Sequence, residues 1–250
     1  MPSGANEDAL TNQQVTVVLP TYNEASNLSD LTDRLFSLGL PKLNMIVVDD
    51  GSPDGTGHVA EELSDQLGGH IEVIQRGTKQ GLGTAYVAGF KKAIRNGADV
   101  VVEMDADQSH DVAYLPAFLK QLENSDVVIG SRYVRGGGSE DWSTFRRFIS
   151  GLGNLGIRWV AGLKVRDSTS GFKAFRISAL QRLDMDNFRC SGFGFQVEVA
   201  HACQQLGYII IEHPIIFKKR ASGKSKMSPF IVVEALYKLS FLRWRTQMRN

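Results

Sequence analysis

The sequence predicts an α/β protein with a mostly parallel central sheet and helices on both faces of that sheet. Two observations predict it. Short apolar runs alternate with segments of helical spacing along the first 130 residues. These runs contain almost no polar positions, which is typical of strands buried on both faces. At 250 residues the chain is long enough for one large domain with a substantial core.

The first half of the chain supplies regular strand and helix units. Residues 15–19 form the first predicted strand, which ends at Pro20, and residues 27–38 follow with leucines at helical spacing. Repeated units of this kind place each strand parallel to the others. Further strands are expected over residues 45–48, 71–75, 100–104 and 126–130, and further helices over 57–67, 83–96 and 115–122.

The second half of the chain is less regular. We expect one continuous domain over residues 15–227, preceded by a disordered tail over 1–14 and followed by a basic amphipathic segment over 228–250. The predicted elements of the second half are a helix over 145–163, a hairpin-like region over 169–175, a helix over 195–206 and a strand over 209–217.

The charge balance argues against a general nucleic-acid binder, because 28 Lys and Arg residues face 27 Asp and Glu residues and the net charge is +1. The charge is unevenly distributed, with an acidic first half and a basic stretch after residue 217. Only Cys190 and Cys203 are present, too few for a disulfide framework or a four-cysteine zinc site, which is typical of a reducing compartment.

The sequence also bears on targeting. Residues 1–14 are polar and acidic and do not resemble a secretory signal, so we expect a cytoplasmic protein. The most apolar long stretch, residues 230–242, is interrupted by Glu234 and Lys238 and is too short to span a membrane. Any membrane contact is therefore expected to be peripheral.

Polar side chains follow several predicted strands at the edge where ligands of open α/β sheets bind. Carboxylates at the ends of three neighbouring strands repel one another, which favours a cation or a ligand between them. Asp105 and Asp107, two residues apart after a strand, can both reach one divalent cation that also binds substrate phosphates. The strand ends are Pro20-Thr-Tyr-Asn-Glu24, Asp49-Asp50, Asp105-Ala-Asp107 and Gly130-Ser-Arg132.

Two familiar nucleotide-binding motifs are absent from the sequence. There is no Gly-x-x-x-x-Gly-Lys-Ser/Thr, and the glycine-rich residues 77–83 neither end in the required lysine nor follow the first strand. The first turn, Pro20-Thr-Tyr-Asn-Glu-Ala25, lacks the glycines of a dinucleotide-binding fold. The strand ends therefore predict a nucleotide diphosphate site without a phosphate loop.

The sequence resembles the inverting glycosyltransferases of family 2 with the GT-A fold, and within them the dolichol-phosphate or polyprenol-phosphate mannose synthases. The resemblance covers residues 17–226 in order. Asp-x-Asp alone is common to many glycosyltransferases, whereas residues 49–56 together with residues 223–226 are specific to polyprenol-phosphate sugar transferases. The matching segments are Val17-Val-Leu-Pro-Thr-Tyr-Asn-Glu24, Val47-Val-Asp-Asp-Gly-Ser-Pro-Asp-Gly-Thr56, Gly81-Leu-Gly-Thr-Ala-Tyr86, Met104-Asp-Ala-Asp107, Ile129-Gly-Ser-Arg-Tyr133, Thr169-Ser-Gly-Phe172 and Arg220-Ala-Ser-Gly-Lys-Ser-Lys226.

The resemblance implies a nucleotide half over residues 15–131, an acceptor half over 132–227 and a role for each matching residue. Asp50 would hold the base, and Asp49 would be structural. Asp105 and Asp107 would bind Mg²⁺ or Mn²⁺, with Ser109 where certain relatives place a glutamine near the metal. The implied nucleotide-sugar residues are Pro20, Tyr22, Glu24, Val48, Asp50, Asp105, Ala106, Asp107, Arg132, Arg220 and Lys226. The implied acceptor-phosphate residues are Arg132, Arg146, Ser150 and Arg220, and the implied catalytic residues are Asp107, Arg132 and Arg220.

The same resemblance implies transfer of mannose from GDP-mannose to a polyprenyl or dolichyl monophosphate, with inversion and release of GDP. Its partners would be these two substrates, the cytoplasmic face of a membrane and, in some relatives, a small membrane-anchoring subunit. Residues 145–163 and 229–248 each have the composition of a basic amphipathic helix that lies on a membrane. Periodicity does not distinguish a lipid-facing side from a core-facing side, so packing on the sheet or on a partner stays open for both.

Three alternatives remain at this point. A polyprenyl-phosphate glucosyltransferase using UDP-glucose would share these motifs, because pocket walls choose the base and the sugar. A non-catalytic subunit of a membrane glycosylation complex has no need to keep Asp105, Asp107, Arg132 and Arg220. A nucleotidyltransferase would release pyrophosphate in place of a nucleoside diphosphate.

Overall fold

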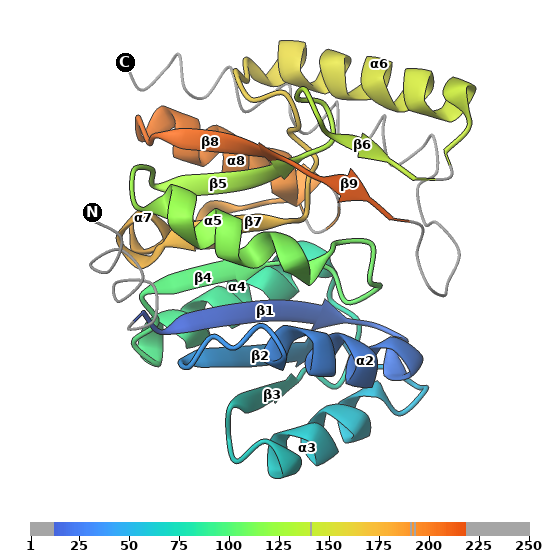
Figure 1. Ribbon diagram of the computed structural model, residues 1–250, viewed down its shortest axis with the longest axis vertical. Helices are drawn as coiled ribbons and strands as arrows, with labels where there is room; N and C mark the ends of the chain where they lie inside the picture. The colour runs from blue at the N-terminus through green and yellow to red at the C-terminus, as the bar shows by residue number, and fades with distance from the viewer. Residues whose placement is uncertain (1–12, 141, 191, 193, 219–250) are drawn as a thin grey trace, which may run out of the picture.

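The structure is a computed structural model that describes residues 13–140, 142–190, 192 and 194–218 (Figure 1). A seven-stranded sheet runs through its centre in the order β3-β2-β1-β4-β7-β5-β8. All neighbours in this sheet pair in parallel except β7, which is antiparallel to β4 and β5. The strands are β1 Val15–Thr21, β2 Leu43–Asp49, β3 Ile71–Gln75, β4 Val100–Glu103, β5 Val127–Ser131, β7 Lys173–Arg176 and β8 Ile210–Pro214.

Helices cover both faces of the sheet and create two apolar cores. Side chains alternate along a strand, so Val17 and Leu19 of β1 pack on one face and Val18 on the other. Helices α2, α3 and α5 contribute to the first core, and α4, α7 and α8 to the second. The helices are α2 Ala25–Phe36, α3 Thr56–Gln66, α4 Leu82–Arg95, α5 Leu115–Leu122, α7 Ile177–Gln181 and α8 Gly194–Gln205.

The predicted elements of the first half are confirmed to within about two residues, and the mostly parallel sheet with helices on both faces is confirmed as well. The prediction of a hairpin-like region over 169–175 was wrong. Only residues 173–176 form a strand, and this strand inserts between β4 and β5 in the central sheet. Its antiparallel partners are distant in sequence, so no local pattern marks the pairing.

The predicted strand over 209–217 was also wrong as a single element. The chain forms β8 up to Pro214 and then β9, Ile216–Phe217, which pairs in parallel with β6, Gly138–Ser139, in a separate two-stranded sheet. Ile215 between them is buried in the core. A proline has no N–H for a ladder hydrogen bond, which accounts for the break at Pro214.

Helix α6, Thr144–Ala161, confirms the predicted helix over 145–163 and lies at one end of the molecule beyond β8 (Figure 1). It begins at Ser143, whose side chain accepts a hydrogen bond from the Arg146 N–H, and ends at Gly162 in the left-handed conformation. Within the part of the chain that is described, no helix has the length and apolar content needed to cross a membrane.

Candidate active site

The candidate site lies where the parallel strands end side by side. Thr21 at the end of β1 pairs with Asp49 at the end of β2, and Val18 of β1 pairs with Glu103 at the end of β4. Because β7 runs in the opposite direction, it begins at this edge, with Lys173 opposite Glu103. The turn before β7 therefore meets the residues that follow β4.

Asp50 fixes the loop that leads into α4. Its carboxylate accepts hydrogen bonds from the backbone N–H groups of Gln80 and Gly81 at 2.9 and 2.8 Å, and it pairs with Arg76 at 3.3 Å. Asp49 accepts from the Thr21 hydroxyl and the Ser52 N–H, at 3.1 and 3.0 Å. Both carboxylates thus shape one side of the site, and base binding by Asp50 stays a prediction.

The loop after β1 carries the next group of predicted nucleotide residues. Pro20 and Tyr22 are half-buried, and the Lys79 ammonium lies 3.6 Å from the centre of the Tyr22 ring. Glu24 begins α2, and its carboxylate accepts a hydrogen bond from Asn27 at 2.7 Å. The Asn23 and Glu24 N–H groups donate to the Ser52 and Thr56 hydroxyls, which joins this loop to the loop after β2. Val48, near the end of β2, is fully buried.

The Asp-x-Asp segment forms a tight turn directly after β4. Asp105 accepts a hydrogen bond from the Tyr86 hydroxyl at 3.1 Å, and Asp107 accepts one from the Ser109 N–H at 3.0 Å. Gln108, which lies between Asp107 and Ser109, is in the left-handed region at φ +61°. Burial and the nearby Asp105 and Glu103 carboxylates raise the pKa of Tyr86 well above its ordinary value, so the hydroxyl stays a donor.

The turn after residue 169 completes this corner of the site. A Cβ atom at Gly171 would lie 3.2 Å from Asp105 Oδ2, so only glycine leaves the carboxylate its present room. Behind the turn, His110 is buried and stacks on Phe172 at 5.1 Å between ring centres. Burial lowers the pKa of His110 to about 4, so the ring is neutral, and its Nδ1 atom accepts a hydrogen bond from the Asp105 N–H at 3.4 Å.

The donor set of this turn fits a hard divalent cation. Asp105 and Asp107 offer carboxylate oxygens, Ala106 between them is buried, and the buried Ser109 Oγ has no hydrogen-bond partner among the described residues. The described residues contain no cluster of three or more His, Cys, Asp or Glu side chains suited to a metal. A cation at this turn would therefore take further oxygens from the substrate diphosphate.

Arg132 is held in the second half of the site by a buried carboxylate. Its Nε and Nη2 atoms donate to the two Asp167 oxygens at 2.8 and 2.7 Å, its backbone N–H donates at 2.9 Å, and Nη2 also donates to Thr169 Oγ1 at 2.8 Å. Burial alone would raise the pKa of Asp167, but the Arg132 charge and hydrogen bonds hold it below its ordinary value. The Arg132 pKa is raised by the same pair against the effect of burial.

Arg146 and Arg132 stack on a shared row of aromatic rings. The Arg146 guanidinium lies 4.4 Å from the Trp142 ring centre, Trp142 contacts Phe217 at 5.9 Å, and Phe217 lies 5.4 Å from the Arg132 guanidinium. Ser150 Oγ lies 2.7 Å from the hydroxyl of Tyr133, the residue after Arg132. The fold therefore gathers these three predicted acceptor-site residues around one region, whereas Arg220 and Lys226 lie outside the described residues.

The predicted set did not include the groups that hold the site residues in place. Asp167 precedes the Thr169 motif, but nothing in the spacing links it to Arg132, 35 positions earlier. Lys173 is fully buried and donates to Glu103 Oε1 and the Ser170 carbonyl, each at 2.6 Å, and also to Gln196. Burial raises the pKa of Glu103, and the Lys173 charge opposes that rise. A lysine inside an apolar strand was the one available signal.

Comparison with known proteins places this chain in a family. The model of "Glycosyl transferase family 2" matches residues 16–184. The chain is 42% identical to the undecaprenyl-phosphate mannosyltransferase of Micrococcus luteus over 92% of its length and 93% of that protein. It is 39% identical to the polyprenol monophosphomannose synthase of Mycolicibacterium smegmatis, over 95% and 91% of the two chains.

A solved structure supports the fold. The glucosyl-3-phosphoglycerate synthase of Mycobacterium tuberculosis, in complex with Mn²⁺, uridine diphosphate and glucosyl-3-phosphoglycerate, superposes with a TM-score of 0.64 at 20% identity, over 95% of this chain and 81% of that one. The central sheet and its covering helices thus have the GT-A arrangement that the sequence resemblance implied. The chain belongs to glycosyl transferase family 2 and is similar, over nearly its whole length, to that family's polyprenyl-phosphate mannosyltransferases.

Proposed function

We propose that the protein transfers mannose from GDP-mannose to a polyprenyl monophosphate and releases GDP. The observation that carries the proposal is the pairing of two sites at one edge of the sheet: the Asp105 and Asp107 turn, which fits a cation that would bind the donor diphosphate, and the Arg132 region, which is suited to the acceptor phosphate. The names of the relatives at 42% and 39% identity support the sugar and the class of acceptor.

The proposed step is a single displacement. An oxygen of the acceptor phosphate forms a bond to the anomeric carbon of mannose while the bond from that carbon to the donor diphosphate breaks, so GDP leaves with the electron pair and the configuration inverts. A phosphate monoester has its second pKa near 6, so the nucleophile is already anionic at neutral pH. No strong general base is required, which agrees with a neutral, packed His110.

The residues of the site bring two anions together. Arg132 is fixed before a phosphate binds, because its Nε and Nη2 atoms donate to Asp167, and Nη1 is the nitrogen that a phosphate oxygen would use. Asp105, Asp107 and Ser109 would hold Mg²⁺ or Mn²⁺, which neutralises the charge that grows on the departing diphosphate. The site thus contributes positioning and charge neutralisation.

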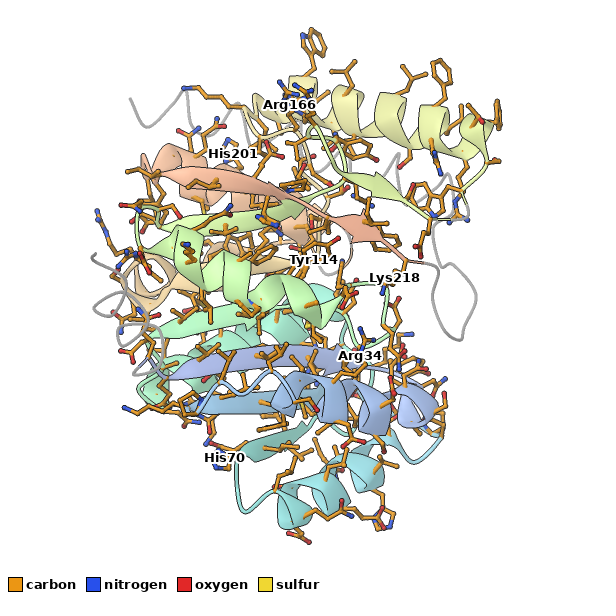
Figure 2. All side chains as sticks on the ribbon, in the orientation of Figure 1. Arg34, His70, Tyr114, Arg166, His201 and Lys218 are labelled. Carbon is orange, nitrogen blue, oxygen red and sulfur yellow. The ribbon has the colours of Figure 1, made fainter. Side chains whose placement is uncertain are left out.

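We also propose that α6 contacts the membrane that holds the acceptor tail. Six large apolar side chains of this helix are exposed, and side chains of α6 project away from the rest of the molecule (Figure 2). Such a row rarely stays in water on a soluble protein, and Arg146 and Arg147 at its start favour an anionic lipid surface. The exposed residues are Phe145, Phe148, Ile149, Leu152, Leu155 and Trp159.

Incubation of the protein with sugar-labelled GDP-mannose, Mg²⁺ and polyprenyl phosphate in detergent tests the proposal. We expect label to enter an organic-extractable lipid, with no transfer from labelled UDP-glucose run in parallel. Transfer from UDP-glucose alone would show that the donor is UDP-glucose and would leave the proposed displacement mechanism unchanged. No transfer from either donor would contradict the proposed function and favour the non-catalytic alternative, and pyrophosphate release would favour the nucleotidyltransferase.

A further inference from the structure

Helix α6 has a polar inner stripe opposite its exposed apolar row. Ser150, Asn154 and Arg158 are spaced by four residues and therefore lie on one side of the helix. Ser150 contacts Tyr133, and Arg158 Nη2 donates to the Lys164 carbonyl at 3.2 Å. These hydrogen bonds attach α6 to the domain alongside Ile157 and Ala161, which pack into the apolar core.

Asn154 makes the most extensive of these attachments. Its Oδ1 atom accepts hydrogen bonds from the Ser168 N–H and hydroxyl at 3.1 and 2.9 Å, and its Nδ2 atom donates to the Arg166 carbonyl. Asn154 is 6% exposed, so these bonds replace water in the fold. They hold the backbone on both sides of Asp167.

The segment that Asn154 holds is also the support of Arg132. Glu212 on β8 accepts from the N–H groups of Arg166 and Asp167 at 2.7 and 2.9 Å, which ties the other side of the segment to the sheet. Arg166 lies close to α6 in Figure 2. Asp167 in turn fixes both the backbone and the guanidinium of Arg132. Hydrogen bonds thus link Asn154 of α6 to the backbone of residues 166 and 168, and the Asp167 side chain between these residues binds Arg132.

We propose that Asn154 is a positioning residue that couples the contact of α6 with a lipid surface to the placement of Arg132. The inference rests on the proposed function, because it assigns α6 to the membrane and Arg132 to the acceptor phosphate. A helix that lies on a membrane is less free to move, and the buried bonds of Asn154 hold the segment around Asp167 to that helix. Lipid contact thus stabilises the described arrangement, in which Asp167 already orients Arg132 for the phosphate.

The test uses the full-length protein, GDP-mannose and a short, water-soluble isoprenyl monophosphate, so that the acceptor does not itself require a membrane. Turnover is measured with and without vesicles of phosphatidylcholine and phosphatidylglycerol. We expect vesicles to raise kcat/KM for the soluble acceptor in the wild type by about 2- to 30-fold, the range of coupling found between linked sites. Asn154→Ala should lose this stimulation, while its KM for GDP-mannose and its sedimentation with vesicles stay unchanged.

Arg158→Met is the matched control, because it removes an inner-stripe bond of α6 that does not reach the Asp167 segment. It should keep the stimulation. Asn154→Ser serves if the alanine variant unfolds, since its hydroxyl is polar but too short to keep the bonds to both Arg166 and Ser168; its stimulation should be reduced. Full stimulation of a folded Asn154 variant, or none of the wild type, overturns the coupling. A wild type that transfers mannose to no isoprenyl phosphate overturns the proposed function itself.

Discussion

Arg132 is preorganised, because Asp167 orients its guanidinium before any substrate binds. An arginine that had to be ordered during the reaction would contribute less to the transition state. The Asp167 side chain is wholly buried, so its ionised form depends on Arg132 and on the hydrogen bonds around it. These two residues form one unit whose stability and function are linked.

Replacing Asp167 by Asn should destabilise the fold by about 3–5 kcal/mol, because it leaves the Arg132 charge buried without its partner. Denaturant unfolding measures this loss. Asp186→Asn is the control, since the Asp186 side chain is 81% exposed in its ion pair with Lys91 and should change stability little. Equal free energies of unfolding for the two variants would contradict a stabilising role of the Arg132–Asp167 pair.

The pH dependence of stability should distinguish the wild type from Asp167→Asn. The folded-state pKa of Asp167 lies below its ordinary value, so its carboxylate stabilises the fold above about pH 4 and loses that contribution as pH falls through the folded-state pKa. The stability gap between the two proteins should therefore be widest at neutral pH and narrow in acid. A gap that stays constant down to low pH would be inconsistent with an ionised Asp167.

Asp107→Ala should lower mannosyl transfer by about a hundredfold or more, the scale on which one lost electrostatic contact acts in a transition state. The fold should survive, because Asp107 lies in a turn after β4 and outside the strand. Initial rates and the far-ultraviolet circular dichroism of the purified variant measure the two effects. Normal turnover by the folded variant would remove Asp107 from the proposed metal site.

Strand β7 shows why part of the site could not be predicted from the sequence. Parallel strand and helix units can be predicted from local patterns. Strand β7, however, lies antiparallel between β5 and β4, which precede it by about 45 and 70 positions. This insertion brings Gly171 to Asp105 and Lys173 to Glu103. The exposed row of α6 is likewise visible only in the structure, because helical spacing alone does not say which side faces the core.

Trp159→Ser on α6 should weaken binding to anionic vesicles by about ten- to a hundredfold, since transfer of one large apolar side chain is worth about 1.5–3 kcal/mol. The thermal stability should not fall, because the side chain is 76% exposed. Ile209→Ser is the control, as an exposed apolar residue outside α6. Equal vesicle binding by both variants and the wild type would remove this face of α6 from the membrane contact.

For the whole molecule, the alternation of apolar runs with helical segments was enough to predict the fold class, whereas the strand ends and the Asp-x-Asp spacing predict one edge of the sheet as the site. Parallel strands end at a common edge, so residues that follow β1, β2 and β4 meet there whatever the loops do. The supports of Arg132 and Asp105 could not be predicted, because they depend on contacts between segments that no periodicity relates. Asp167, Lys173 and Asn154 are the examples.

We propose that one edge of the sheet aligns a donor diphosphate and an acceptor phosphate for a single displacement. The stereochemistry of the isolated product distinguishes this mechanism from a double displacement. Nuclear magnetic resonance of the lipid formed from GDP-mannose, whose mannose is α-linked, should show polyprenyl phosphate carrying β-linked mannose. An α-linked product would require two successive displacements with a nucleophile of the enzyme, and would contradict the proposed single displacement.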